Sequence, residues 1–180
     1  VYEMFDMVSD EGRAKYHDFQ RKGMYNGYKG LTFWTPNINI FRDPRWGRGM
    51  ETYGEDPFLT TKMGLAVVKG LQGDGTQKYD KAHACAKHYA VHSGPEWSRH
   101  SYNAENISIR DLRETYLPAF KALVTEGKVK EVMCAYNRFE GEPCCSNKTL
   151  LINILKDEWG FDDVIVSDCG AIADFYTKGR

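Results

Sequence analysis

One carboxylate stands where a buried strand would run directly into a turn. Asp168 follows the apolar segment 163–167 and precedes Cys169 and Gly170. A carboxylate at the end of a strand is held rigidly at the edge of a sheet, where it can act as a nucleophile or accept a proton. The alternative is a local role, in which Asp168 caps a helix that starts after Gly170. We expect Asp168 to be the catalytic residue.

Polar residues also follow three earlier apolar segments. Lys87 and His88 come after segment 82–86, and Tyr136 comes after segment 132–135. The remaining cluster follows the run from Leu31 to Ile40 and consists of Arg42, Asp43, Pro44, Arg45, Trp46, Gly47 and Arg48. Charged side chains of this kind suit hydrogen bonds to ligand hydroxyls, although a surface ion pair for the lysine and a core position for the histidine are the competing interpretations. Ligands of parallel α/β proteins bind at the carboxyl ends of the strands, so we expect all four clusters on one face.

The apolar spacing predicts strands that alternate with helices, which is the order of a parallel α/β sheet. The expected strands are 31–40, 82–86, 132–135 and 163–167. The expected helices run from Asp56, as N-cap before Pro57, to Leu71, from Ser108 to Gly127, and from Lys148 to Trp159 with Gly160 as its stop. A leading helix is expected near 10–21, and a further one begins at Ala171. Pro118 should bend its helix without ending it, because the apolar spacing continues beyond it.

The length indicates an incomplete barrel. A closed eight-stranded (β/α) barrel needs about 250 residues, whereas this chain has 180 and begins with Val1. We therefore expect a partial TIM-type barrel of four to five strand–helix units, with residues 1–180 forming an internal fragment of a longer catalytic domain. The open strand edges of such a fragment would invite aggregation or self-association.

The composition argues against several classes of partner. Lys and Arg number 24 against 25 Asp and Glu, so there is no basic excess for nucleic acid. No apolar run approaches the ~20 residues that span a bilayer, and no membrane partner is expected. The compartment stays open, and a periplasmic or secreted location is compatible with the sequence.

His83, Cys85, His88 and His92 are metal-ligating residue types in one short stretch. Their spacing alternates between the two faces of a strand, so we expect the side chains to point apart and predict no metal site. The chain has five cysteines. In the Cys144-Cys145 loop, a cysteine could pair with Cys134 or stay reduced.

Five short motifs in order resemble those of glycoside hydrolase family 3, the retaining exo-acting β-glycosidases. They are the segment from Asn37 to Glu51, Gly54-Glu55-Asp56-Pro57, Ala86-Lys87-His88-Tyr89, Val132-Met133-Cys134-Ala135-Tyr136-Asn137, and Val166-Ser167-Asp168-Cys169-Gly170. The resemblance extends from about residue 31 to 175 and is strongest to β-xylosidases and β-glucosidases, with the chain as a fragment of their N-terminal barrel domain. Cys169 departs from the tryptophan that usually follows the nucleophile in the family, which leaves the shape of the sugar pocket open.

The resemblance implies roles for individual residues. Asp168 corresponds to the family nucleophile, and Arg48, Lys87 and His88 correspond to residues that hold sugar hydroxyls. Tyr136 and Met133 are expected to line the pocket, with simple packing an equal alternative for Met133. Arg42 and Arg45 are expected to form structural ion pairs with nearby carboxylates.

The implied reaction is a double displacement that removes a terminal, non-reducing β-D-xylosyl or β-D-glucosyl residue from an oligosaccharide, with no cofactor. In the resembling family the acid/base glutamate comes from a later, C-terminal domain. The loop carboxylates Glu51, Glu55, Glu96 and Glu140 do not end strands, so the isolated chain should be inactive. The alternatives are a β-glycoside phosphorylase and a non-catalytic carbohydrate-binding fragment.

Overall fold

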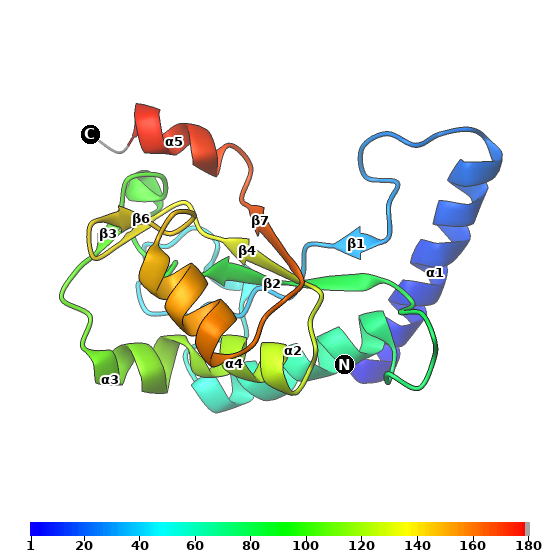
Figure 1. Cartoon of the computed structure of the whole chain (residues 1–180), viewed down its shortest axis with the longest axis horizontal. Coiled ribbons are helices and arrows are strands. Elements are labelled where there is room, and N and C mark those ends of the chain that lie inside the picture. The colour runs from blue at the N-terminus through cyan, green and yellow to red at the C-terminus, as the bar shows by residue number, and fades with distance from the viewer. Residues whose placement is uncertain (179–180) are drawn as a thin grey trace.

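A computed structural model describes residues 1–178 and contains one four-stranded parallel sheet (Figure 1). The strands lie in the order β1, β2, β4, β7. Their bounds are Thr32–Phe33 for β1, His83–Tyr89 for β2, Glu131–Cys134 for β4 and Val164–Ser167 for β7. Every neighbouring pair is parallel. The chain is thus the α/β structure expected, a partial (β/α) barrel with an open strand at each edge.

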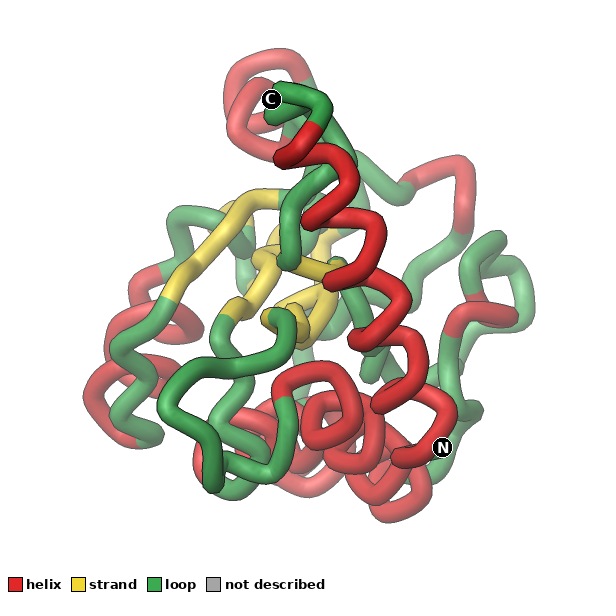
Figure 2. The backbone as a smooth tube through the Cα atoms, turned by 90° about the vertical axis from the view of Figure 1, so that its right-hand side faces the viewer, coloured by secondary structure: helices red, strands yellow, loops and turns green. Residues whose placement is uncertain are grey.

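Three crossover helices cover one face of this sheet, and Figure 2 shows most of the helical tube gathered on that side of the strands. They are α2 (Pro57–Gln72), α4 (Pro118–Thr125) and η4 (Thr149–Glu158), the last with π-type hydrogen bonding. The core between helices and sheet includes Val67, Leu71, Ala84, Ala86, Phe120, Leu123, Val132, Leu155 and Trp159. Because side chains alternate along a strand, the residues between these core positions face the uncovered side.

Local sequence signals explain where the helices begin and end. The Asp56 carboxylate accepts hydrogen bonds from the backbone N–H of Phe58 and Leu59 at 2.7 and 3.0 Å, as expected for the N-cap before Pro57. After η4, Gly160 has a φ of +69°, a conformation that glycine adopts without strain. Both predicted boundaries are confirmed.

The predicted helix 108–127 is one helical path in three parts, α3 (Ile109–Asp111), η3 (Leu112–Tyr116) and α4. The Ser108 hydroxyl caps its start by accepting from the Asp111 N–H at 2.9 Å. Just before Pro118 the Leu117 N–H donates to the Leu112 carbonyl at 2.9 Å, which closes a wider turn. The proline therefore changes the local winding and the helix continues beyond it, as its apolar spacing predicted.

Three predicted boundaries are wrong. Of the expected strand 31–40, only β1 and a single bridge at Asn37 pair with β2, because Pro36 has no N–H to donate to a continuous ladder. Strand β2 extends to Tyr89, so Lys87 and His88 lie within it and not after it. The leading helix α1 spans Tyr2–Arg21 and begins well before residue 10.

A small sheet and several short turns extend the carboxyl end of the main sheet. The small sheet consists of β3 (Asn103–Ala104), β5 (Arg138–Phe139) and β6 (Glu142–Pro143). Short helical turns η1 (Gly49–Glu51) and η2 (Glu96–Ser98) and the helix α5 (Ala171–Thr177) complete the list. Residues 179–180 of the predicted C-terminal helix lie outside the described residues. None of the helices within residues 1–178 combines the length and apolarity that a bilayer crossing requires.

Candidate active site

Asp168 directly follows β7 and is 6% exposed. Its Oδ1 accepts a hydrogen bond from the Cys169 N–H at 2.8 Å, which orients the carboxylate. Its Oδ2 has no hydrogen-bond partner in the part of the chain that the structure describes. Instead, Oδ2 lies 3.5 Å from His88 Nε2 and 3.9 Å from Arg48 Nη1. One oxygen is therefore anchored, and the other is available to react.

Arg48 reaches this carboxylate from the loop after residue 40 and is held by Glu51. The Arg48 Nε and Nη2 atoms donate to the two Glu51 oxygens at 2.7 and 2.8 Å. The Asn37 amide donates to Glu51 Oε2 at 3.4 Å. This two-point contact fixes the guanidinium plane and leaves Nη1 directed toward Asp168, as the planar fork of arginine allows. The pKa of Glu51 is lowered mainly by the Arg48 hydrogen bond, so the pair is ionised at neutral pH.

His88 is buried at 1% exposure and is held by Asn39. The Asn39 Oδ1 accepts from the His88 backbone N–H at 2.8 Å and lies 3.0 Å from His88 Nδ1, while Asn39 Nδ2 donates to the His88 carbonyl at 2.8 Å. Burial lowers the pKa of His88 well below its ordinary value, and the neighbouring His92 and Arg48 add to the effect. His88 is thus a neutral imidazole beside Asp168.

Lys87, Tyr136 and Met133 complete the group of predicted site residues. Burial and then Arg48 lower the pKa of Lys87, with Glu51 and Asp168 acting in the opposite direction. The Tyr136 hydroxyl donates to the Cys169 carbonyl at 2.8 Å, and burial followed by the Asp168 charge raises its pKa to about 12.

Met133 is buried next to Lys87 in the register of β2 and β4, and its alternation with the core residue Val132 places it on the sheet face opposite the helices. Five of the predicted site residues therefore lie in or just after the carboxyl ends of β2, β4 and β7, and Arg48 reaches Asp168 from a loop.

The expectation that His88 and His92 point apart is wrong, because the chain turns after Tyr89 and strand alternation stops there. Their rings lie 4.9 Å apart, and His92 Nδ1 contacts Asn137 Oδ1 at 2.9 Å. Burial lowers the pKa of His92 to about 4. Across residues 1–178 no three His, Cys, Asp or Glu side chains form a group that could hold a metal ion.

The two other arginines of the 42–48 segment differ from each other. Arg45 forms the predicted ion pair, with Nε and Nη2 donating to Asp43 at 2.9 and 2.7 Å. For Arg42 the structure shows a different contact, because its guanidinium packs over the Tyr116 ring at 5.6 Å. The segment is tied to the next loop by Glu96, whose carboxylate accepts from the Gly47 N–H at 3.0 Å.

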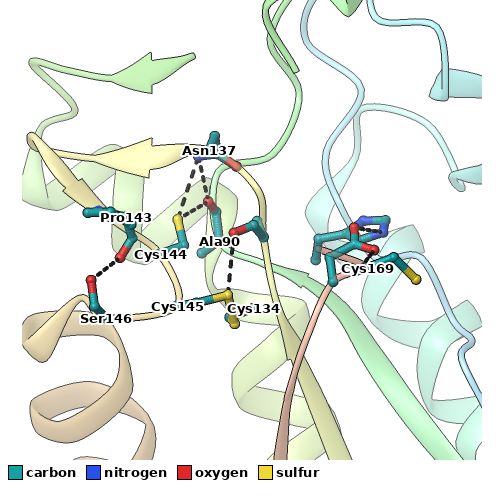
Figure 3. Close-up of a disulfide and its surroundings, with 11 residues drawn as sticks. Ala90, Cys134, Asn137, Pro143, Cys144, Cys145, Ser146 and Cys169 are labelled. Carbon is teal, nitrogen blue, oxygen red and sulfur yellow. Dashed lines mark hydrogen bonds and ion pairs between the residues drawn. A yellow bond between two sulfur atoms is a disulfide. The ribbon is translucent and has the colours of Figure 1, made fainter. Parts of the chain in front are cut away.

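A disulfide joins Cys134 at the end of β4 to Cys145 (Figure 3). It holds the loop after β6 against the main sheet. The neighbouring Cys144 is buried and reduced, and its thiol lies between Asn137 and the Ala90 carbonyl, as Figure 3 shows. Cys169 is an exposed thiol away from the disulfide. Of the pairings left open by the sequence, the structure selects Cys134 with Cys145.

The sequence did not predict the residues that orient the side chains around Asp168. Glu51, Asn39 and Asn137 each fix the side chain of a residue beside Asp168. The available signal was the pair of asparagines inside the apolar run 31–40, since a polar residue in such a run needs a buried partner. Three of the loop glutamates considered for acid/base chemistry are occupied: Glu51 by Arg48, Glu96 by Arg99 and Glu140 by the Ile107 N–H.

A hollow of about 680 Å³ lies elsewhere on the chain. It is bounded by α1 and the 28–34 segment and is lined mainly by apolar side chains such as Val8, Phe19 and Phe33. The geometry around the carboxylate, and not the size of a hollow, identifies the candidate site.

Known proteins have sequences similar to nearly the whole of this chain. The chain is 57% identical over 182 residues to a xylan 1,4-beta-xylosidase of Xylanibacter ruminicola, a match that covers 100% of the chain and 21% of the relative. It is 42% identical to beta-D-xylosidase 1 of Arabidopsis thaliana, covering 98% of the chain and 22% of the relative. The chain thus spans about a fifth of the length of these relatives.

Two solved structures also resemble this chain over nearly its whole length. A GH3 exo-beta-xylosidase in complex with a xylobiose aziridine activity-based probe superposes with a TM-score of 0.87 at 36% identity, covering 99% of this chain and 23% of that one. A beta-glucosidase from Listeria innocua superposes with a TM-score of 0.79 at 34% identity, covering 100% and 24%. Residues 25–180 match the family model described as the glycosyl hydrolase family 3 N terminal domain. The chain therefore belongs to glycosyl hydrolase family 3.

Proposed function

We propose that this chain is part of a longer polypeptide that acts as an exo-acting retaining β-glycosidase on terminal, non-reducing β-D-xylosyl or β-D-glucosyl residues of oligosaccharides. The observation that carries the proposal is the state of Asp168, with one oxygen anchored by the Cys169 N–H and the other unpaired beside Arg48 and His88. A nucleophilic carboxylate needs this combination, since it must be oriented and ionised but not consumed by a strong hydrogen bond.

In the proposed mechanism Asp168 attacks the anomeric carbon and forms a glycosyl ester. Water then cleaves that ester, and two displacements on the same carbon restore the original configuration. Arg48 and Lys87 carry positive charge next to the nucleophile and can donate hydrogen bonds to sugar hydroxyls. The rotationally fixed Arg48 sets the orientation of the terminal sugar.

The proton donor for the leaving oxygen is proposed to come from a part of the polypeptide outside residues 1–180. Retaining enzymes need a second carboxyl about 5–5.5 Å from the nucleophile. Glu51, which holds Arg48 beside Asp168, is already paired with that arginine. Because the relatives are about five times longer than this chain, the rest of the polypeptide offers room for that group. The isolated chain should then be inactive.

The similarity to xylosidases favours xylosides over glucosides as substrates. The 57% identical relative is named for xylan, whereas the beta-glucosidase from Listeria innocua is 34% identical. Since aryl glycosides release a chromophore on cleavage, aryl β-xyloside and aryl β-glucoside are the direct substrates for comparison.

The test uses the full polypeptide that contains this chain, with Asp168→Asn as the variant. We expect aryl β-xyloside turnover to fall by several orders of magnitude, because an amide cannot form the glycosyl ester. Asp163→Asn is the matched control, since Asp163 is a half-exposed carboxylate that lies 3.7 Å from Lys130. Normal turnover by Asp168→Asn would refute the assignment. Acceleration by added phosphate would indicate phosphorolysis, and no aryl release by the unmodified protein would leave only sugar binding.

A further inference from the structure

The two buried histidines beside the nucleophile are each held by an asparagine in the same way. For His88, the orientation of the Asn39 amide is set by the backbone, because Nδ2 donates to the His88 carbonyl and Oδ1 accepts from the His88 N–H. The atom that lies 3.0 Å from His88 Nδ1 is therefore an oxygen that can only accept. His88 Nδ1 must carry a hydrogen to make this contact.

The same reasoning applies to His92. Asn137 Nδ2 lies within hydrogen-bond distance of the Ala90, Val91 and Arg138 carbonyls at 3.3, 3.4 and 3.0 Å, and Figure 3 shows this amide directed at Ala90. Its Oδ1 is thus the atom at 2.9 Å from His92 Nδ1. Both imidazoles carry the hydrogen on Nδ1, and neither Nε2 has a hydrogen-bond partner within the described residues.

The protonation state of His88 determines whether it can form a hydrogen bond with Asp168. A neutral imidazole with hydrogen on Nδ1 has a lone pair on Nε2, and His88 Nε2 lies 3.5 Å from Asp168 Oδ2. Nε2 and Oδ2 are then both acceptors, so no hydrogen bond forms between them. Arg48, Lys87 and Arg99 are cations near this ring, and with burial they lower its pKa. A hydrogen atom must come from a group that enters the site.

We propose that Asn39 is a positioning residue that fixes His88 in the Nδ1–H form, so that Nε2 accepts a hydrogen bond from a hydroxyl of the terminal sugar and leaves Asp168 Oδ2 free to attack. The inference rests on the proposed function, because it assigns a role toward the same sugar. An imidazolium at this place would donate to Asp168 and hold the carboxylate in an ion pair. Asn39 prevents that state because its amide oxygen carries no full negative charge to stabilise a cation.

The first test locates hydrogen directly and needs no turnover. Neutron diffraction from deuterium-exchanged crystals of the full polypeptide near pH 7 should show deuterium on Nδ1 and none on Nε2 of His88, with the same pattern at His92. Deuterium on His88 Nε2 would overturn the proposal. If the proposed glycosidase function itself were wrong, the unmodified protein would release no aryl group. Failure of the histidine proposal and failure of the proposed function therefore give different results.

The second test asks whether the sugar hydroxyl is the donor. Aryl β-xylosides in which each hydroxyl in turn is replaced by fluorine retain an acceptor of similar size but cannot donate. At one hydroxyl position, we divide kcat/KM for the hydroxyl substrate by kcat/KM for the fluoro substrate. This ratio should be roughly tenfold smaller in Asn39→Asp than in the unmodified protein. The reason is that a carboxylate at Nδ1 favours the imidazolium, which makes Nε2 a donor. Taking the ratio within each protein cancels the electronic effect of fluorine.

Asn147→Asp is the matched control for this substitution. Asn147 is also buried, its Nδ2 donates to the Phe139 carbonyl at 3.0 Å, and its Oδ1 accepts from the Leu150 N–H at 2.9 Å. Asn147→Asp therefore loses the same kind of amide donor at a position that contacts Phe139 and Leu150. If no fluorine position changes its ratio in Asn39→Asp beyond the change in Asn147→Asp, the proposed acceptor role of His88 is wrong.

Discussion

Glu51 is expected to control substrate binding through Arg48, although it touches no substrate itself. Its two oxygens accept from Arg48 Nε and Nη2 at 2.7 and 2.8 Å, and the remaining Nη1 is directed at Asp168. In Glu51→Gln the carboxamide keeps one acceptor and places an NH₂ group against a guanidinium N–H. The arginine plane then loses its fixed orientation, and Nη1 no longer stays in position for the sugar.

The size of the effect follows from the exposure of the pair. A hydrogen bond to a charged group contributes about 1.5–3 kcal/mol, and partial exposure reduces this. The Arg48 and Glu51 side chains are 18% and 37% exposed, so about 1–2 kcal/mol is reasonable, which corresponds to roughly a 5- to 30-fold change. We expect most of it in KM for aryl β-xyloside and a smaller part in kcat, because Asp168 itself is unchanged.

Steady-state kinetics of Glu51→Gln and Glu114→Gln in the full polypeptide provide the comparison. Glu114 is the control because it also pairs with an arginine, Arg110, at 2.9 Å but is exposed and remote in sequence from the site. Equal KM values for the two variants would refute the positioning role of Glu51.

A stability measurement adds an independent check. The folded pKa of Glu51 is lowered, so its stabilising contribution is complete above the ordinary glutamate pKa of about 4.3 and is lost as pH falls through the lower folded value. The difference in unfolding free energy between Glu51→Gln and the unmodified protein should therefore shrink in acid.

Two further predictions concern stability, with unfolding of the full polypeptide as the measurement. Burial lowers the pKa of His92 to about 4, so between about pH 6.5 and 4 the unfolded chain takes up a proton that the folded chain does not. As pH falls through this window, His92 alone should lower the unfolding free energy by about 1.4 kcal/mol per pH unit, in addition to the contribution of His88. His92→Gln should therefore reduce this loss of stability, whereas His83→Gln, at a half-exposed histidine, should not. Cys145→Ser opens a disulfide with a sequence separation of 11 residues and should cost about 3 kcal/mol, while Cys169→Ser, at an exposed free thiol, should cost little. A pH profile unchanged by His92→Gln, or equal melting of the two cysteine variants, would contradict these expectations.

Much of the fold could be predicted from the sequence because the signals for helices and strands lie in neighbouring residues. The cap at Asp56 and the stop at Gly160 depend only on nearby backbone groups, and both are confirmed. The strand expected at 31–40 failed for a related reason. Apolar content alone suggested a continuous strand, whereas Pro36 cannot donate to the ladder, and the Asn37 and Asn39 side chains bond Glu51 and His88.

The location of the site was also predictable, since parallel strands carry their polar ends to one edge of the sheet. Asp168, Arg48 and His88 meet there although 120 positions separate Arg48 from Asp168. The disulfide needed the structure, because sequence spacing left Cys134 with two partners or none and only the approach of the loop after β6 selects Cys145.

The sequence by itself thus determined the alternation of strands and helices, the family, and the residue types at the strand ends. Each of these features depends on residues that are close together in the sequence. Only the tertiary structure decided which side chains hold the site residues in place. Glu51 orients Arg48, Asn39 orients His88 and Asn137 orients His92, and the two asparagine contacts span 49 and 45 positions. The two asparagine pairings depend on distances of about 3 Å between atoms that are brought together only when the sheet assembles, so the local sequence does not say which histidine each asparagine contacts.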